Sequence, residues 1–322
     1  MLANGEEQPA VPAASARLGP PQLKVIAAFA AIYTIWGSTY LAIKIPIETI
    51  PPFLMAGSRF LIAGGLLDIV VRLRGAEKPT VAQWESAAVV GSLMFLAGNG
   101  ALTWSEQKVP SGLAALLLSI IPLWMVFLHH LELRRPLGRQ LMFGLALGLA
   151  GIAVLVGPHE LLGGGQVIPS GAIVLVLGFF SWAPESLRSR RGGMPKSSPL
   201  AASMEMLTGS AGLFLLGFFT GEGNAIGHPA ISTRSLLAVA YLVVFGSFLG
   251  FTSYTWLLGV SSPSRAATYA YVNPIIAVFI GWALGSEPVT PRVLAALAVI
   301  VTAVALIVTH EPPGPADECG FQ

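Results

Sequence analysis

The sequence contains little charge and a single cysteine. Only 11% of its 322 residues are charged and 54% are hydrophobic, whereas soluble domains average about 25% charged residues. A chain with so few charges exposes most of its surface to lipid rather than to water. Because Cys319 stands alone, an internal disulfide and a metal site with several cysteine ligands are excluded.

Motifs for nucleotide, metal and acyl-transfer chemistry are also absent. No G-x-x-x-x-G-K-[ST], H-E-x-x-H or G-x-S-x-G pattern occurs, which excludes ATP hydrolysis at a P-loop and two common kinds of hydrolase site. His129 and His130 are adjacent, so they would point to different sides of a helix, a poor geometry for a shared metal. The sequence predicts no enzyme, no cofactor, no metal and no nucleic-acid partner.

Long apolar stretches dominate what remains. Ten of them are long enough, or nearly so, to cross a hydrocarbon core of about 30 Å as helices. They lie at residues 24–44, 53–73, 81–104, 110–131, 138–157, 171–188, 199–220, 235–258, 263–285 and 290–309. With the N-terminus inside, 13 of the 18 basic residues fall on the cytoplasmic side, 4 fall outside, and Arg59 lies within a span. This asymmetry predicts that both termini are cytoplasmic.

The chain also repeats itself. Residues 98–156 align without a gap on residues 250–308, an offset of 152 that places Pro122 on Pro274. Because each copy has an odd number of spans, five, the second must insert upside down relative to the first. Such inverted repeats are typical of secondary transporters. The sequence therefore predicts an all-α integral membrane protein with ten transmembrane helices, arranged as two inverted five-helix repeats around a central cavity.

This layout divides the chain into four parts. We expect residues 1–23 to be a disordered cytoplasmic tail, since they lack the basic start and apolar core of a secretory signal. Residues 24–157 would form the first repeat with helices one to five, and residues 171–309 the second repeat with helices six to ten. Residues 310–322 would form a second cytoplasmic tail.

Two motifs resemble the EamA family of the drug/metabolite transporter superfamily. They are Trp36-Gly37-Ser38-Thr39-Tyr40 followed by Arg59-Phe60, and Trp104-Ser105-Glu106-Gln107 followed by Pro110-Ser111-Gly112-Leu113-Ala114-Ala115-Leu116-Leu117 and Pro122. The resemblance covers residues 24–309. It implies ten helices in an inverted arrangement, a central cavity and export of small metabolites, amino acids and their derivatives among them. The chain departs from the family at Pro184-Glu185, where small residues are usual.

We therefore expect a secondary transporter of the bacterial inner membrane that exports amino acids, their derivatives or toxic analogues by alternating access. A proton gradient and facilitated diffusion are both compatible with the sequence, and the oligomeric state stays open. One alternative is an exchanger of sugar phosphates or nucleotide sugars, but such anions would need several basic residues in the cavity, and Arg59 is the single one within a span. The other alternative is a receptor, a scaffold or a lipid-modifying enzyme, which would need no inverted cavity.

Polar and aromatic residues inside the spans are candidates for the wall of the cavity, because polar groups of lipid-embedded helices usually face the bundle interior. Tyr269 and Asn273 are four residues apart and share a helix face. Their alternative role is hydrogen bonding between helices. The full set is Trp36, Ser38, Tyr40, Asn99, Tyr269 and Asn273.

Four charged residues are candidates for gating or ion coupling. Arg59 and Glu205 correspond at an offset of 146, which suggests opposite charges at mirrored depths; the alternative is that each reaches its nearer interface or a local partner. Glu185 would either bind a proton or cationic group, or pair with Arg188 one turn later. Glu106, at the expected outer mouth, would attract cations or be a solvated loop residue.

Prolines and glycines mark expected bends and close contacts. Pro122 and Pro274 each remove a backbone hydrogen bond at matching positions, and Pro184 does the same in the sixth span. We expect these three helices to bend there. Gly246 and Gly250 form a small-xxx-small pair, which favours close helix packing.

Overall fold

The computed structural model describes residues 22–118, 169–181, 193–195, 197–225, 230–260 and 269–308, together with isolated positions between 139 and 154. The regular structure of the described residues is helical throughout. The helices are α1 (Gln22–Lys44), η1 (Pro46–Glu48), α2 (Pro52–Leu73), α3 (Val81–Gly91), η2 (Ser92–Asn99), α4 (Gly100–Ser105), α5 (Ser111–Leu118), α8 (Pro169–Phe180), α10 (Ser198–Phe219), η3 (Glu222–Ala225), α11 (Thr233–Tyr241), η4 (Leu242–Leu249), α12 (Gly250–Val260), α14 (Tyr269–Gly285) and α15 (Pro291–Val308).

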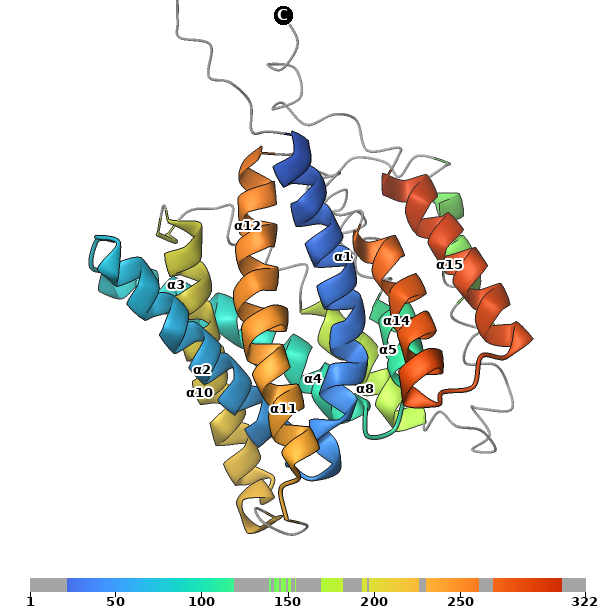
Figure 1. Cartoon of the computed structure of the whole chain (residues 1–322), viewed down its shortest axis with the longest axis horizontal. Helices are drawn as coiled ribbons and strands as arrows, with labels where there is room; N and C mark the ends of the chain where they lie inside the picture. The colour runs from blue at the N-terminus through green and yellow to red at the C-terminus, as the bar shows by residue number, and fades with distance from the viewer. Residues whose placement is uncertain are drawn as a thin grey trace, which may run out of the picture.

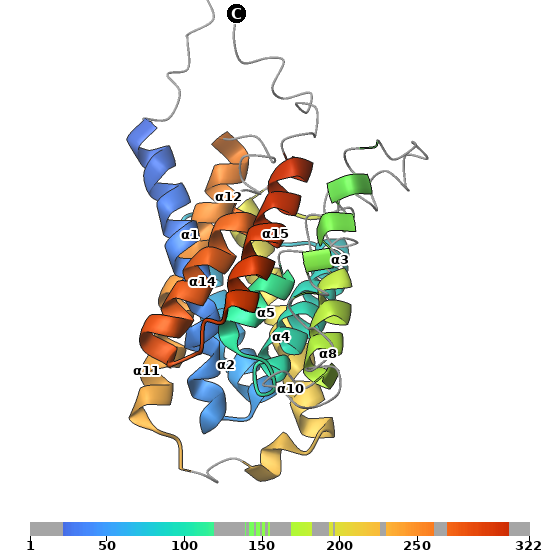
Figure 2. The ribbon, with the colours of Figure 1, turned by 90° about the vertical axis from the view of Figure 1, so that its right-hand side faces the viewer.

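The helices stand side by side in one bundle (Figures 1 and 2), and α1 begins at the end of the bundle where α15 finishes. In the described part of the chain, five helical segments are long and apolar enough to cross a membrane. They are Gln22–Glu48, Pro52–Leu73, Val81–Ser105, Ser198–Phe219 and Thr233–Tyr254. Three shorter apolar helices accompany them, at Ser170–Phe180, Val272–Gly285 and Pro291–Ala303. These helices match, to within a few residues, the stretches expected at 24–44, 53–73, 81–104, 199–220, 235–258 and 290–309. The stretches expected at 110–131, 138–157, 171–188 and 263–285 lie partly outside the described residues.

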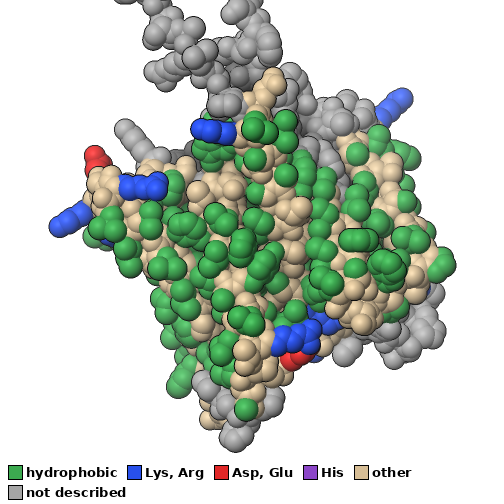
Figure 3. Space-filling model, viewed as in Figure 1, with side chains coloured by type: hydrophobic (Ala, Val, Ile, Leu, Met, Phe, Trp, Pro, Cys, Tyr) green, Lys and Arg blue, Asp and Glu red, His purple; other side chains and the backbone are tan. Residues whose placement is uncertain are grey.

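The outer surface of the bundle is apolar. Figure 3 shows hydrophobic side chains over the middle of the visible face, with basic and acidic side chains near its ends. Large side chains such as Ile69 on α2, Phe219 on α10 and Leu284 on α14 are more than half exposed, at 56%, 80% and 73%. An exposed apolar surface of this extent suits a lipid environment rather than water.

The first helices of the two halves run in opposite directions. Gly171, near the start of α8, lies against Lys108 in the loop after α4, and Ser181, just past the end of α8, donates a hydrogen bond of 2.6 Å to the carbonyl of Leu93. The connection after α1 and the loop after α4 line the same hollow. Since α8 begins at the end of the bundle where α1 finishes, the two helices are antiparallel.

The second helices of the two halves also run in opposite directions. Leu54, near the start of α2, contacts Gly217 near the end of α10, and Gly64 further along α2 lies against Met206 earlier in α10. The absence of a Cβ at Gly64 and Gly217 lets the two backbones approach closely. This contact joins the two halves along the whole length of α2.

Two long helices contain a π-helical segment at matching places. The helix formed by α3, η2 and α4 is π-helical over Ser92–Asn99, and the helix formed by α11, η4 and α12 is π-helical over Leu242–Leu249. A π turn interrupts the regular i to i−4 ladder, and such turns are frequent at functional sites. The Asn99 amide group donates to the Met94 carbonyl at 3.0 Å and so compensates for the altered ladder.

Candidate functional site

An aromatic cluster joins α1 to the second half of the chain. The indole Nε1 of Trp36 donates a hydrogen bond of 3.2 Å to the carbonyl of Gly246 in η4. The Trp36 ring lies 5.5 Å from the ring of Phe251, 5.2 Å from Tyr254 and 5.1 Å from Tyr269, measured between centroids. Rings from α1, α12 and α14 therefore form one wall, which brings together Trp36 and Tyr269, two candidates for the wall of the cavity.

The glycine pair Gly246 and Gly250, in the helix formed by α11, η4 and α12, makes room for this cluster. A Cβ at Gly250 would collide with the Trp36 Nε1, and a Cβ at Gly246 would lie 3.0 Å from the Thr39 methyl group. The close helix packing expected from Gly246 and Gly250 is confirmed, and the helix that they admit is α1.

Ser38 and Tyr40 follow Trp36 on α1 and have different surroundings. The Ser38 hydroxyl lies 2.7 Å from the Tyr241 hydroxyl, so it joins α1 to α11 by a hydrogen bond. Tyr40 is 5% exposed and belongs to the hydrophobic core cluster that also contains Met55 and Leu116. Of the two, Ser38 lies on the side of α1 that faces α11.

The amide of Asn273 is buried beside the same wall. Asn273 is 3% exposed, and its Oδ1 has no hydrogen-bond partner among the described residues. Its backbone carbonyl lies against Gly37, next to Trp36, and Tyr269 precedes it by one helical turn. A buried amide oxygen without a donor is costly, so this atom has unused hydrogen-bonding capacity. Pro274 lies inside α14.

The side chain of Arg59 reaches from α2 to η4. It is 5% exposed, its Nε donates a hydrogen bond of 3.0 Å to the Ser247 hydroxyl, and its guanidinium carbon lies 4.7 Å from the centroid of the Phe60 ring. Arg59 is thus buried with a partner in the other half of the chain and does not reach an interface, and its role in gating stays a prediction. Glu205 lies in α10 and is partly buried.

An ion pair closes one end of the bundle. Glu287, in the loop between α14 and α15, accepts a hydrogen bond of 2.7 Å from Lys44 Nζ at the end of α1. It also accepts from Ser111 N, Ser111 Oγ and Gly112 N at 2.8, 2.9 and 3.0 Å, so it occupies the N-terminus of α5, where the helix dipole favours an anion. Gly281 leaves the space, because a Cβ there would lie 2.6 Å from Glu287 Oε2. We call the contacts of Glu287 with Lys44, Ser111 and Gly112 the latch.

Electrostatics keep Glu287 ionised in the latch. Burial alone would raise its pKa, but the hydrogen bonds from Lys44, Gly112 and Ser111 outweigh burial and lower the pKa below its ordinary value. No sequence motif singles out Lys44 or Glu287. A carboxylate in an otherwise uncharged loop, at the position where the first repeat carries Arg135, was the available signal.

Glu106 is buried next to the latch. It directly follows the span Val81–Ser105, is 2% exposed, and neither of its carboxylate oxygens has a hydrogen-bond partner among the described residues. Burial and the neighbouring Glu287 raise its pKa well above the ordinary value, against the opposing effect of Lys44 and Arg59. Of the two alternatives for Glu106, the solvated loop residue does not agree with this burial, and attraction of cations stays a prediction.

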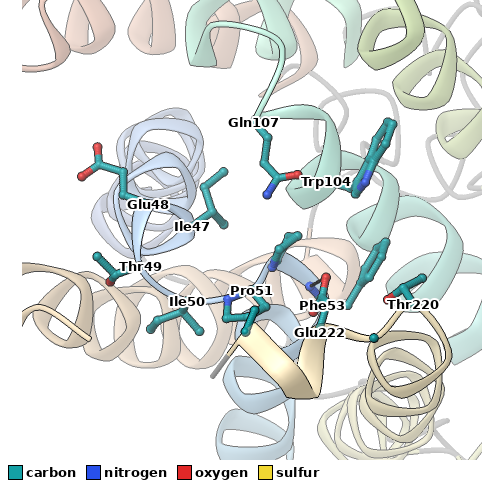
Figure 4. A pocket seen from close by; sticks show the side chains of 13 residues that line it. Ile47, Glu48, Thr49, Ile50, Pro51, Phe53, Trp104, Gln107, Thr220 and Glu222 are labelled. Atoms are coloured by element: carbon teal, nitrogen blue, oxygen red, sulfur yellow. Dashed lines mark hydrogen bonds between the residues drawn. The ribbon is translucent and has the colours of Figure 1, made fainter. Parts of the chain in front are cut away.

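A hollow of about 420 Å³ opens at the same end of the bundle (Figure 4). Its wall consists of the connection between α1 and α2, from Ile47 to Phe53, together with Trp104, Gln107 and residues around Glu222. Glu222 accepts hydrogen bonds from the backbone N–H groups of Phe53 and Leu54 at 3.2 and 3.0 Å and so caps α2. The hollow is a vestibule lined by three connecting loops.

Three of the expected site residues lie outside the described residues. They are Pro122, Pro184 and Glu185. Asn99 is described, and its side chain serves the π segment of its own helix. Among the described residues, no group of three or more His, Cys, Asp or Glu side chains could hold a metal ion.

Comparisons with known proteins place this architecture in a family. The model of the EamA-like transporter family matches residues 23–157 and 169–309, one copy on each half. The uncharacterized inner membrane transporter YedA of Escherichia coli strain K12 is 39% identical to this chain over 287 residues. The match covers 88% of this chain and 90% of YedA.

Two further comparisons agree. A protein of Salmonella typhimurium named as a probable amino-acid metabolite efflux pump is 24% identical over 277 residues, covering 84% of this chain and 90% of that protein. A crystal structure without a functional name matches with a TM-score of 0.62 at 19% identity, over 88% of this chain and 97% of the other, and so shares the fold. Taken with the family match to both halves, these results identify the chain as a transporter of the EamA-like family, within the drug/metabolite transporter superfamily.

Proposed function

We propose that this protein exports small amphipathic metabolites, amino acids or their derivatives, across the inner membrane by alternating access between two inverted five-helix halves. The opposite directions of α1 and α8, and of α2 and α10, support an inverted arrangement. The common end reached by the start of α1 and the end of α15 supports two termini on one side, the cytoplasmic side according to the basic residues.

The contacts between the halves support a rocking motion. In the first half, α1 packs against α12 and α14, and in the second half its counterpart α8 packs against α4 and α5. These contacts of α1 with the second half therefore have equivalents in the contacts of α8 with the first half. Two halves related in this way can exchange their inner and outer contacts, which is how inverted-repeat transporters alternate access.

The buried Asn273 oxygen beside the aromatic wall is the observation that carries the substrate class. An amide oxygen accepts hydrogen bonds from an ammonium group, and the faces of Trp36 and Tyr269 attract cations. The apolar part of a substrate would pack on the same rings. This combination suits an amino acid or an amine-bearing derivative rather than a purely apolar drug.

The charges of the described residues disfavour the anion exchanger. Their buried charged side chains are Arg59 and Glu106, one of each sign. A sugar phosphate or nucleotide sugar would need an excess of buried positive charge. A receptor, scaffold or lipid-modifying enzyme would have no use for antiparallel halves joined by small-residue contacts.

Efflux from proteoliposomes tests the proposal. Liposomes that contain the full chain would be preloaded with members of an amino-acid panel, and with matched analogues that lack the amine or the carboxylate. We expect flux of at least one amine-bearing member, and an increase of about tenfold or more in its KM for Asn273→Leu, since a hydrogen bond to a charged group contributes about 1.5–3 kcal/mol. Absence of flux for every panel member would contradict the proposed function.

A matched control separates substrate contact from damage to the fold. Asn224 lies in η3 and is exposed, so Asn224→Leu removes an amide of the same kind without touching the aromatic wall. We expect its KM to equal that of the unmodified chain. An equal effect of both variants would assign the loss to general destabilisation and would remove Asn273 from substrate binding.

A further inference from the structure

We propose that Glu106 is a proton-binding site: it holds a proton while the latch is closed, and loss of this proton opens the latch. The role of this proton in transport rests on the alternating-access function proposed above. The binding of the proton can be measured without a transported substrate.

The first argument is the lack of donors around Glu106. The side chain is 2% exposed, and both Oε1 and Oε2 lack a hydrogen-bond partner among the described residues. An ionised carboxylate in such a place has neither water nor N–H groups to stabilise it. A neutral carboxylic acid costs much less to bury than the ion, so burial without donors favours the form with a bound proton.

The second argument is that the neighbouring cations are already occupied. Lys44 is held by Glu287 at 2.7 Å, and Arg59 donates to Ser247 at 3.0 Å. Glu287 has four donors and the N-terminus of α5. When two carboxylates share one site, the better-stabilised group keeps the charge and the other takes the proton. In this pair, Glu287 is the charged group and Glu106 the protonated one.

The titratable and charged groups that interact with Glu106 come from three parts of the fold. Tyr40 and Lys44 belong to α1, Arg59 to α2, and Glu287 to the loop after α14. Burial raises the Glu106 pKa first and Glu287 raises it further, while Lys44 and Arg59 lower it less. The closed latch therefore binds the Glu106 proton more tightly than an open, hydrated state would.

The coupling between proton and latch follows from competition for Lys44. When Glu106 releases its proton to water, its carboxylate attracts Lys44 and repels Glu287, and both effects weaken the latch. Glu106 and Ser111 stand at the two ends of the short loop from α4 to α5, so a shift at Glu106 is passed to the N–H groups that hold Glu287. Raising the pH should thus open this end of the bundle, by up to about tenfold in the opening equilibrium per pH unit.

Two measurements on the full chain in lipid nanodiscs test the proposal. Infrared spectroscopy should detect the carbonyl stretch of a protonated carboxylic acid at neutral pH, and Glu106→Gln should remove it. Hydrogen–deuterium exchange of the peptide that contains Ser111 and Gly112 should become faster with rising pH, beyond the intrinsic rate. In Glu106→Gln, which is always neutral, the same peptide should stay protected.

Two latch variants and one control complete the design. Glu287→Gln and Gly281→Ala should expose Ser111 and Gly112 at every pH, the second without a change of charge. Glu48, an exposed carboxylate at the same end of the bundle, should have no effect when changed to Gln. An infrared band that persists in Glu106→Gln, or equal exchange in Glu106→Gln and the unmodified chain at all pH values, would overturn the proton site and leave the proposed transport intact.

Discussion

Lys44 and Glu287, 243 positions apart in the chain, form an ion pair with an Nζ–Oε1 distance of 2.7 Å. The pair joins the last residue of α1 to the loop before α15, so it ties the first half of the chain to the second. Its carboxylate also caps α5. One side chain thus connects three elements at a single end of the bundle.

A charge swap tests this geometry. Because Glu287 binds Ser111 and Gly112 as well as Lys44, the variant Lys44→Glu with Glu287→Lys places a cation at the N-terminus of α5. We expect no rescue: the swap should destabilise the protein at least as much as Glu287→Gln, about 1–3 kcal/mol for a buried charge-assisted hydrogen bond. Thermal unfolding of the full chain in detergent measures both. A swap that restores the original melting temperature would reduce the latch to a simple ion pair.

Stability should decrease toward both acid and alkaline pH, and a different carboxylate should cause each decrease. The pKa of Glu287 is below its ordinary value near 4.5, so its stabilisation is present above that pH and disappears as the pH falls through the lowered folded-state value. The pKa of Glu106 is well above 4.5, so stability decreases as the pH rises from 4.5 through the raised value. Melting temperatures against pH should lose the acid limb in Glu287→Gln and the alkaline limb in Glu106→Gln. Identical profiles for the two variants would contradict the assignment.

The contact between Trp36 and the glycine pair predicts a specific steric effect. A Cβ added at Gly250 collides with the Trp36 indole, and overpacking of this kind costs about 1–3 kcal/mol. Gly250→Ala should therefore lower the melting temperature, and Trp36→Phe should restore part of it by removing the indole nitrogen. Gly65→Ala is the matched control, because nothing lies within 4 Å of a Cβ at that position. An equal effect of both alanine variants would place the cause outside the Trp36 contact.

Much of this architecture could be predicted from the sequence because apolar length and composition determine which segments become helices. The stretch expected at residues 53–73 is the helix Pro52–Leu73, and the one at 199–220 is Ser198–Phe219. The π segments Ser92–Asn99 and Leu242–Leu249 could not be predicted, since an added residue in a helical turn leaves the apolar pattern almost unchanged.

The site was harder to predict for a physical reason. A residue's type can be read locally, but its partner depends on how the two halves dock. Arg59 was identifiable as a charge in a span, and its partner Ser247 lies 188 positions away in the other half. Glu106 stands in a loop by sequence and is buried in the fold, because the helices around it close over the loop.

Arg59 provides the last prediction, on transport itself. Its guanidinium joins α2 to η4 through Ser247, and Arg59 is the one buried basic residue among the described residues. Arg59→Gln should abolish efflux while expression and membrane insertion stay normal. The glutamine amide can still bond to Ser247, but the variant loses the positive charge that lowers the pKa of Glu106. Arg59→Lys keeps the charge and should retain part of the flux. Arg72→Gln is the control, since the ion pair of the exposed Arg72 among the described residues is with Asp68, one turn earlier on the same helix, where such pairs contribute about 0–1 kcal/mol. Unchanged efflux in Arg59→Gln, measured per folded protein in proteoliposomes, would remove Arg59 from the transport mechanism and leave it a role in packing alone.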